Sequence, residues 1–456
     1  MNAVAGLVNQ SGVGKGDKVT VMLPNIPEFV YSYFGVVKNG AVVVPLNTLS
    51  TPWELTYLLN NSDSKLLITQ TSQIKKFNEI KDKLGSCHQV IAIDALNQNG
   101  ELLSGEASRN ASIADVEIVP EDPAVMIYTA GLTGRPLGAV LTHGNLCSQA
   151  EVTQSIIKRT PDDIALALIP LFHAFGATAN MLLIIRAGSS IVMMDRFTME
   201  SFFSAIEREK ITYISAVPRL FMGMIFYEKA SKYDVRSLNL CVTGGSPMPA
   251  DFLPVFENKF GIRLLEGYGL TEASPVCSFN RPDILTKPGS IGLPIQGVEI
   301  KIVDDDSREM PRNEIGELIV RGDNVMKGYY NNEAATASVI RNGWLHTGDL
   351  GRMDEDGYIF LTGLKKRMII TSGFNVYPRE VETVLKTHPA VKAVSISGKE
   401  DMMRGEIVKA SIVCKEGQSA DEKEIIRYCK IYLSSYKVPR EVEFVQEISK
   451  STDIEY

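Results

Sequence analysis

Short runs of aliphatic and β-branched residues alternate with longer amphipathic segments along most of the chain. Runs of strand length include KVTVML, AVVVPL, KLLIT and QVIAI, while PEFVYSYFGVVKNG has the apolar spacing of a helix. The same rhythm returns in IALALIPL, SSIVMMD, ITYISAVP and LNLCVTGG. Strands that alternate with helices form parallel sheets covered on both faces, so the pattern predicts a large doubly wound α/β domain.

The pattern changes from residue 316 onward. GELIVRG and GYIFLTG are short strand patterns separated by Gly, Asn and Asp turns, which predicts a β-rich subdomain. The segment after Gly363 reads as a strand, a proline-opened helix, two strands and a last helix with Ser419 as its N-cap. This predicts a small α+β domain of about 90 residues. We therefore divide the chain into a large domain, residues 1–363, and a small C-terminal domain, residues 364–456.

Composition and charge narrow the choice of partners. Hydrophobic residues make up 45% of the chain and charged residues 22%, which is a globular composition with a large core. The net charge is −7 and no basic block stands out, so nucleic acid is not expected as a partner. Six scattered cysteines without a C-x-x-C pair suit a reducing compartment, and we expect a cytoplasmic protein. Arg186 and Gly188 interrupt the apolar stretch ANMLLIIRAGSSIVMM, so no transmembrane helix is expected, which leaves peripheral membrane contact open.

A glycine-rich stretch, YTAGLTGRPLGAVLTHGNL at residues 128–146, reads as a strand, a turn and the start of a helix. Gly131 and Gly134 permit positive φ angles and let backbone amides approach an anion. Thr129 and Thr133 add hydroxyl donors. The loop is not a Walker A sequence, because no Gly-Lys-Ser/Thr follows. By itself it fits an ordinary strand-to-helix turn as well as it fits a phosphate cradle.

Six further motifs follow this loop in order. They are PLFHAFG at 170–176, VTGGSPMP at 242–249, EGYGLTEASP at 266–275, KPGSIGLP at 287–294, GWLHTGDLG at 343–351 and SGFNVYPREVE at 372–382. Together they resemble the acyl-activating, adenylate-forming enzymes, which include acyl-CoA synthetases, coumarate ligases, luciferases and the adenylation domains of peptide synthetases. The resemblance covers nearly the whole chain, and GYGLTE and PLFHAFG look most like fatty-acyl and aryl-CoA ligases.

The resemblance implies a two-step reaction on a small carboxylic acid. In this family a carboxylate attacks the α-phosphate of ATP to give an acyl-adenylate and pyrophosphate, and a thiol then displaces AMP. Such a protein positions its reactants and neutralises the charge that develops in the reaction. The resemblance therefore implies ATP, Mg²⁺ and CoA as cofactor and co-substrates, with a fatty or aromatic acid as the substrate.

The resemblance also assigns residues to the nucleotide. Thr271 would reach the α-phosphate, Glu272 would hold Mg²⁺, and Asp349 would accept the ribose hydroxyls. From the residues alone, Glu272 could instead be an acid at a helix N-terminus, and Asp349 could be a turn residue. The ATP-binding residues implied by the resemblance are Thr129, Gly131, Thr133, Gly134, Ser246, Pro247, Glu266, Gly267, Tyr268, Gly269, Thr271 and Asp349.

The same resemblance implies which residues contact the acyl group and CoA. His173, which joins Thr271 and Glu272 in the expected catalytic set, would border the acyl pocket. Without the family, His173 reads as a satisfied core histidine. The remaining expected pocket residues are Phe175, Val217 and Gly245. Lys366 would be the hinge of a mobile C-terminal domain, although LKKRM also reads as a solvated linker, and Gly373 would lie beside the CoA tunnel.

Five positions depart from the family pattern. The phosphate loop has Ala130, Leu132 and Leu137 where hydroxyls and a lysine are usual, and Leu364 stands where an arginine reaches the ribose. Glu455 occupies the place of a lysine that stabilises the adenylation transition state. Both ends of the chain look truncated relative to the family. We therefore expect impaired adenylation with nucleotide binding retained; the alternative is a catalytically disabled nucleotide- or acyl-binding protein of the same fold.

Overall fold

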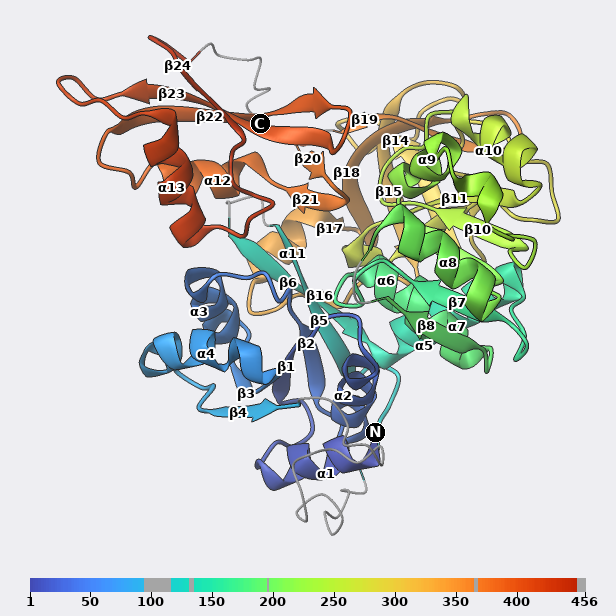
Figure 1. The fold of residues 1–456 in the computed structure, drawn as a ribbon, viewed down its shortest axis with the longest axis horizontal. Coiled ribbons are helices and arrows are strands. Elements are labelled where there is room, and N and C mark those ends of the chain that lie inside the picture. Colours follow the sequence, from blue (N-terminus) through green and yellow to red (C-terminus); the bar gives the residue numbers. More distant parts are fainter. Residues whose placement is uncertain (94–115, 131–134, 195–196, 365–367, 449–456) are drawn as a thin grey trace.

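The computed structural model describes residues 1–93, 116–130, 135–194, 197–364 and 368–448, and it arranges them around four β-sheets (Figure 1). The mixed α/β architecture with a separate C-terminal sheet confirms the predicted fold class. No helix within these ranges is long and apolar enough to cross a lipid bilayer.

The first sheet has the strand order β16-β6-β5-β2-β1-β3-β4. Its five strands from β5 to β4 are parallel, and β6 and β16 run antiparallel at one edge. The strands are β1 (Lys18–Met22), β2 (Val42–Pro45), β3 (Ser64–Thr69), β4 (Gln89–Ala92), β5 (Pro123–Ala130), β6 (Pro136–Thr142) and β16 (Gly328–Tyr329). The associated helices are α1 (Asn2–Gln10), α2 (Pro27–Lys38), α3 (Pro52–Asn61), α4 (Ile74–Ile80) and α5 (His143–Ile157).

The predicted strand-turn-helix reading of the glycine-rich stretch is wrong. The turn joins β5 to a second strand, β6, and the two form an antiparallel hairpin in which Thr129 lies opposite Leu137. Helix α5 begins only at His143, where the Thr142 hydroxyl accepts the Asn145 amide at 3.1 Å as its N-cap. The alternating apolar residues of PLGAVLT, which suit a half-buried strand, carried this information.

The second sheet has the order β13-β12-β11-β10-β9-β7-β8 and is parallel from β11 to β8. Each of the four runs predicted as strands in this part of the chain forms a short strand here, and all except β8 are mostly buried. The strands are β7 (Ile164–Ala167), β8 (Ser190–Met193), β9 (Tyr213–Ala216), β10 (Leu240–Thr243), β11 (Arg263–Gly269), β12 (Val276–Phe279) and β13 (Leu293–Pro294). The helices are α6 (Ala174–Ala177), α7 (Leu183–Arg186), α8 (Met199–Glu209), α9 (Pro218–Phe226), α10 (Phe252–Phe260) and the short 3₁₀ turn η6 (Thr271–Ala273).

The third and fourth sheets follow in the chain. The third contains β14 (Val298–Val303), β15 (Gly316–Gly322), β17 (Ile340–Arg341), β18 (Trp344–Met353) and β19 (Ile359–Leu364), with α11 (Glu333–Val339) beside it. The fourth contains β20 (Ile369–Thr371), β21 (Phe374–Val376), β22 (Val391–Asp401), β23 (Gly405–Cys414) and β24 (Glu441–Phe444), with helices α12 (Pro378–Leu385) and α13 (Glu422–Tyr432). The fourth sheet and its two helices are the orange and red elements toward the top left of Figure 1.

Two details of the C-terminal domain differ from expectation. Strands β21 and β24 were not predicted, because three or four residues are too few to show a period. The N-cap of α13 is Asp421, whose carboxylate accepts the Glu424 amide at 2.7 Å, and not Ser419. Helix α12 opens at Pro378 as predicted. The proposed division of the chain at residue 363 stays a prediction.

A buried group of three charges joins the two domains. Lys437, after α13, donates to Glu54 of α3 at 2.8 Å and to Glu380 of α12 at 2.6 Å. All three residues are buried. Burial alone would lower the pKa of Lys437, but the two carboxylates and Tyr436 outweigh it and raise that pKa, so the lysine stays charged. Helix α3 is therefore tied to the C-terminal domain.

Replacing Lys437 by methionine should destabilise the chain by about 3 to 5 kcal/mol, because two buried carboxylates would lose their cation. Chemical denaturation of the full chain measures this. Lys399→Met is the matched control, since the Lys399 and Glu441 side chains are 54% and 34% exposed and such a pair contributes about 1 kcal/mol or less. Equal effects of the two variants would contradict the prediction.

Candidate active site

The Glu272 carboxylate is held between two elements of the first sheet. Its Oε1 atom accepts a hydrogen bond from the Thr129 hydroxyl at the end of β5 at 2.9 Å. The same oxygen accepts the Tyr329 hydroxyl of β16 at 2.8 Å. Burial, together with the Glu272 charge, raises the pKa of Tyr329 far above its usual value, so this hydroxyl is a permanent donor. The structure thus brings the predicted Thr129 and Glu272 together.

The surroundings of Glu272 fit the expected Mg²⁺. Mg²⁺ binds proteins through one or two carboxylates and completes its shell with water and substrate phosphates. Across the described ranges, no cluster of three or more His, Cys, Asp or Glu side chains could hold a metal by itself. A single carboxylate with one oxygen already oriented is therefore the type of site that would hold Mg²⁺ together with ATP.

The expected adenine site lies at the end of β11, beside the loop of residues 244–249 that follows β10. A buried carboxylate joins the two, because Glu266 of β11 accepts the Met248 amide at 2.9 Å. Ser246 and Pro247 precede Met248 in this loop; Ser246 is partly exposed and Pro247 is exposed. Gly269 is required by packing, since a Cβ there would lie 2.0 Å from the Pro275 carbonyl oxygen. Gly267 has a similar constraint, because a Cβ there would lie 2.4 Å from the Phe279 ring.

The expected adenine and ribose residues meet through a direct hydrogen bond. The Tyr268 hydroxyl of β11 donates to the Asp349 carboxylate of β18. Burial and the Asp349 charge raise the pKa of Tyr268 well above its usual value. The Asp349 amide donates to the Thr347 hydroxyl at 3.0 Å, inside β18 and at the place where its register with β15 shifts. Leu364, at the position of the family arginine, lies opposite Asp349 in the pairing of β18 with β19.

The predicted acyl-pocket residues also lie together. A Cβ placed on Gly245 would lie 3.8 Å from Val217 and 3.9 Å from Phe175. Gly245 has φ +81°, a conformation that favours glycine. His173 caps α6, its Nδ1 accepting the Phe175 amide at 3.2 Å, and burial lowers the pKa of the imidazole. His173 is therefore a neutral ring with its proton on Nε2.

The C-terminal domain reaches this pocket. A Cβ on Gly373, in the turn between β20 and β21, would lie 3.5 Å from Val217. Val217 therefore stands between the predicted acyl pocket and the residue predicted to border the CoA tunnel. Burial, with the charges of Glu272 and Asp349, raises the pKa of Tyr377 of the same domain. Both domains contribute to one site.

Several predicted residues lie outside the described ranges, so their roles stay predictions. They are Gly131, Leu132, Thr133, Gly134, Lys366 and Glu455. Sequence reasoning missed Tyr329 and Tyr377. The only local signals were the tyrosine pair in MKGYYNN and the tyrosine before Pro378, and neither indicates what its hydroxyl contacts.

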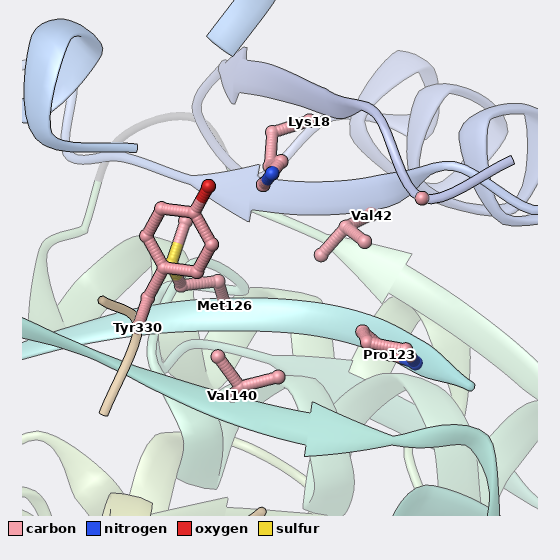
Figure 2. Close-up of a pocket in the computed structure, with 7 residues that line it drawn as sticks. Lys18, Val42, Pro123, Met126, Val140 and Tyr330 are labelled. Carbon is pink, nitrogen blue, oxygen red and sulfur yellow. The ribbon is translucent and has the colours of Figure 1, made fainter. Parts of the chain in front are cut away.

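A small cavity of about 90 Å³ lies elsewhere, between β1, β2, β5 and β6 (Figure 2). Lys18, Met126, Val140 and Tyr330 are among its lining residues. Sites for molecules of the size of a drug or a nucleotide occupy roughly 300 to 1,000 Å³, so this cavity is too small for ATP or CoA.

The expected nucleotide and acyl residues lie close together, and the C-terminal domain contacts them through Gly373. The sequence model of the AMP-binding enzyme family matches residues 1–330, and that of the AMP-binding enzyme C-terminal domain matches residues 380–453. The chain belongs to this family. It is an acid–thiol ligase of the acyl-CoA synthetase type, and it uses ATP, Mg²⁺ and CoA.

Individual relatives differ in the acid that their names give. The chain is 35% identical to a long-chain-fatty-acid–CoA ligase of Bacillus subtilis, covering 98% of this chain and 85% of the relative. It is 33% identical to 4-coumarate–CoA ligase 3 of Oryza sativa, covering 98% and 82%. A solved double mutant of the o-succinylbenzoate CoA synthetase of Bacillus subtilis, bound with a product analogue, has a TM-score of 0.87 and 30% identity and covers 99% of this chain and 89% of that one.

Glu266 gives the site a measurable pH dependence. Burial raises the pKa of its carboxyl to about 7, above the ordinary 4.5. Between these values the folded chain keeps a proton that the unfolded chain has lost, so this group lowers stability as the pH rises from about 4.5 to about 7.

Glu266→Gln should remove this pH-dependent loss of stability. The side-chain oxygen of glutamine still accepts the hydrogen bond from the Met248 backbone amide, and it carries no charge that must be buried. The variant should be more stable than the unaltered chain by about 3 kcal/mol at pH 8 and equal to it near pH 4. Denaturation midpoints at several pH values test this. Glu257→Gln is the control, since Glu257 also accepts a backbone amide, that of Leu264 at 3.0 Å, but is 32% exposed. A constant difference between Glu266→Gln and the unaltered chain would contradict the assignment.

Proposed function

We propose that this acyl-CoA synthetase activates a long-chain fatty acid. The observation that carries the proposal is the contact of Phe175, Val217 and Gly245, an apolar wall that suits an aliphatic chain. The name of the Bacillus subtilis relative supports the same class of acid. The relative named for coumarate has almost the same identity, so an aromatic acid is the alternative.

The residues near Glu272 and Asp349 would bind ATP in this proposal. Glu272 would hold Mg²⁺ on the phosphates, Thr271 would contact the α-phosphate, and Asp349 would accept the ribose hydroxyls. Thr129 reaches Glu272 in this structure, so its hydroxyl would act on the phosphates together with that carboxylate. The loop with Ser246 and Pro247 would cover the adenine.

The position of the C-terminal domain supports the thioester step. Gly373 lies against Val217, so a thiol that enters beside Gly373 would meet the acyl carbonyl at the pocket wall. We propose that this arrangement forms the thioester, and that rotation about Lys366 gives the arrangement for adenylation. All six cysteines are free thiols, which supports the proposed cytoplasmic location.

The substrate proposal is tested by thioester formation with palmitate, octanoate, coumarate and ferulate, followed with CoA, ATP and Mg²⁺. We expect palmitate to give the highest kcat/KM, because each buried methylene adds to binding in an apolar pocket, by about 0.8 kcal/mol. Val217→Asp should remove this preference, whereas Val217→Leu should keep an apolar wall. A higher kcat/KM for coumarate or ferulate would contradict the fatty-acid assignment.

Leu137→Lys should raise the rate of acyl-adenylate formation. Directly paired residues in an antiparallel hairpin place their side chains on one face, so position 137 shares the face of Thr129, whose hydroxyl contacts Glu272. A lysine there would bring an ammonium group to the phosphates, and one such preorganised donor contributes roughly 10²-fold or more.

Pyrophosphate release measures this change, and Leu137→Met is the neutral control of similar size. Adenylation in the lysine variant alone would favour the nucleotide-binding alternative for the unaltered chain. Equal rates in all three proteins would show that the missing lysine does not limit the reaction.

A further inference from the structure

The short segment of residues 326–329 forms hydrogen bonds with Glu272 at two points. The Met326 amide donates to the Glu272 carbonyl oxygen at 2.8 Å. Three residues later, the Tyr329 hydroxyl donates to the Glu272 carboxylate at 2.8 Å. The segment thus fixes both the backbone and the side chain of this residue.

The segment is itself held by neighbouring elements. Gly328 and Tyr329 pair with Val140 and Ala139 of β6, so β16 is attached to the strand that follows the phosphate loop. The Tyr329 amide donates to the Thr336 hydroxyl at 2.9 Å. From the other side, the Asn145 side-chain amide near the start of α5 donates to the Asp323 and Val325 carbonyls at 2.7 Å and 3.1 Å. Tyr329 is therefore a donor on a rigid support.

The two hydroxyl donors at the carboxylate share one oxygen. Thr129 and Tyr329 both donate to Oε1 of Glu272, and within the described part of the chain no hydrogen bond reaches Oε2. Two donors on one oxygen determine the rotation of the carboxylate, and they leave Oε2 for a cation. A charge-assisted hydrogen bond of this kind is about twice as strong as a neutral one.

We propose that Tyr329 is a positioning residue that orients the Glu272 carboxylate for the divalent cation of the ATP complex. The inference rests on the proposed role of Glu272 as the cation ligand. Tyr329 acts through Glu272 and touches neither ATP nor the acid in this proposal. Its loss would weaken cation binding without changing the adenine or ribose contacts.

The adjacent Tyr330 supplies a matched control. Tyr330 directly follows β16, and its ring faces the small cavity of Figure 2, where Met126 of β5 also lies. Its hydroxyl donates to Asp63 at 2.9 Å, and the Lys18 ammonium lies 4.4 Å from the centre of its ring. Tyr330→Phe therefore also removes a tyrosine–carboxylate hydrogen bond, but on the face away from Glu272.

The experiment measures Mn²⁺ binding to the full chain by electron paramagnetic resonance, in the presence of a non-hydrolysable ATP analogue. Tyr329→Phe should raise the Kd for Mn²⁺ roughly tenfold, the loss expected for one hydrogen bond to a charged group. AMP affinity, measured by calorimetry without a metal, and the thermal midpoint should stay the same. Tyr330→Phe should leave the Mn²⁺ affinity unchanged.

Glu272→Gln separates this inference from the role of Glu272. Loss of Mn²⁺ affinity in Glu272→Gln with no change in Tyr329→Phe would overturn the positioning role alone. Unchanged Mn²⁺ affinity in Glu272→Gln would overturn the ligand role of Glu272 and the inference with it. If Tyr329→Phe lowered the AMP affinity by the same factor as the Mn²⁺ affinity, and also lowered the thermal midpoint, Tyr329 would be merely structural.

Discussion

Three elements of the candidate site meet at the carboxylate of Glu272. The residues that meet there are distant in sequence, because Thr129 lies near the end of β5, Glu272 lies in η6 and Tyr329 lies in β16. A partly buried carboxylate needs hydrogen-bond donors, and these two hydroxyls supply them. The need of this carboxylate for donors holds three elements together: β5, the turn η6 that follows β11 of the second sheet, and β16. The candidate site therefore depends on one electrostatic requirement.

The contact between the two domains also depends on buried charged groups that need partners. Lys437 lies between Glu54 and Glu380, and each of the three charges would be costly to bury without the others. If the two domains separated, Lys437 and one of its carboxylate partners would be hydrated again. This hydration lowers the electrostatic cost of separating the domains. A polar contact of this kind, unlike a large apolar one, is compatible with the proposed rotation of the C-terminal domain.

Residue patterns predicted most of the strands and the order of the domains. The runs that became β1 to β4 and β7 to β10 were visible because short stretches rich in aliphatic and β-branched residues fit the strands of a parallel sheet. The hairpin of β5 and β6 was missed, because a glycine-rich turn after a strand serves a following strand as well as a helix. Serine and aspartate are both good N-cap residues, so the sequence left Ser419 and Asp421 as equal choices. In the structure the Glu424 amide donates to the Asp421 carboxylate, which makes Asp421 the cap.

The sequence by itself determined the fold class, the family and most of the expected nucleotide and acyl residues, because these depend on local pattern and on motifs that survive in linear order. Only the tertiary structure decided that the Thr129 hydroxyl donates to Glu272, that Tyr268 donates to Asp349, and that Gly373 rests on Val217. Such contacts join residues tens to hundreds of positions apart. A hydroxyl or carboxylate carries no local sign of its partner, since sheet pairing and domain packing place the two together.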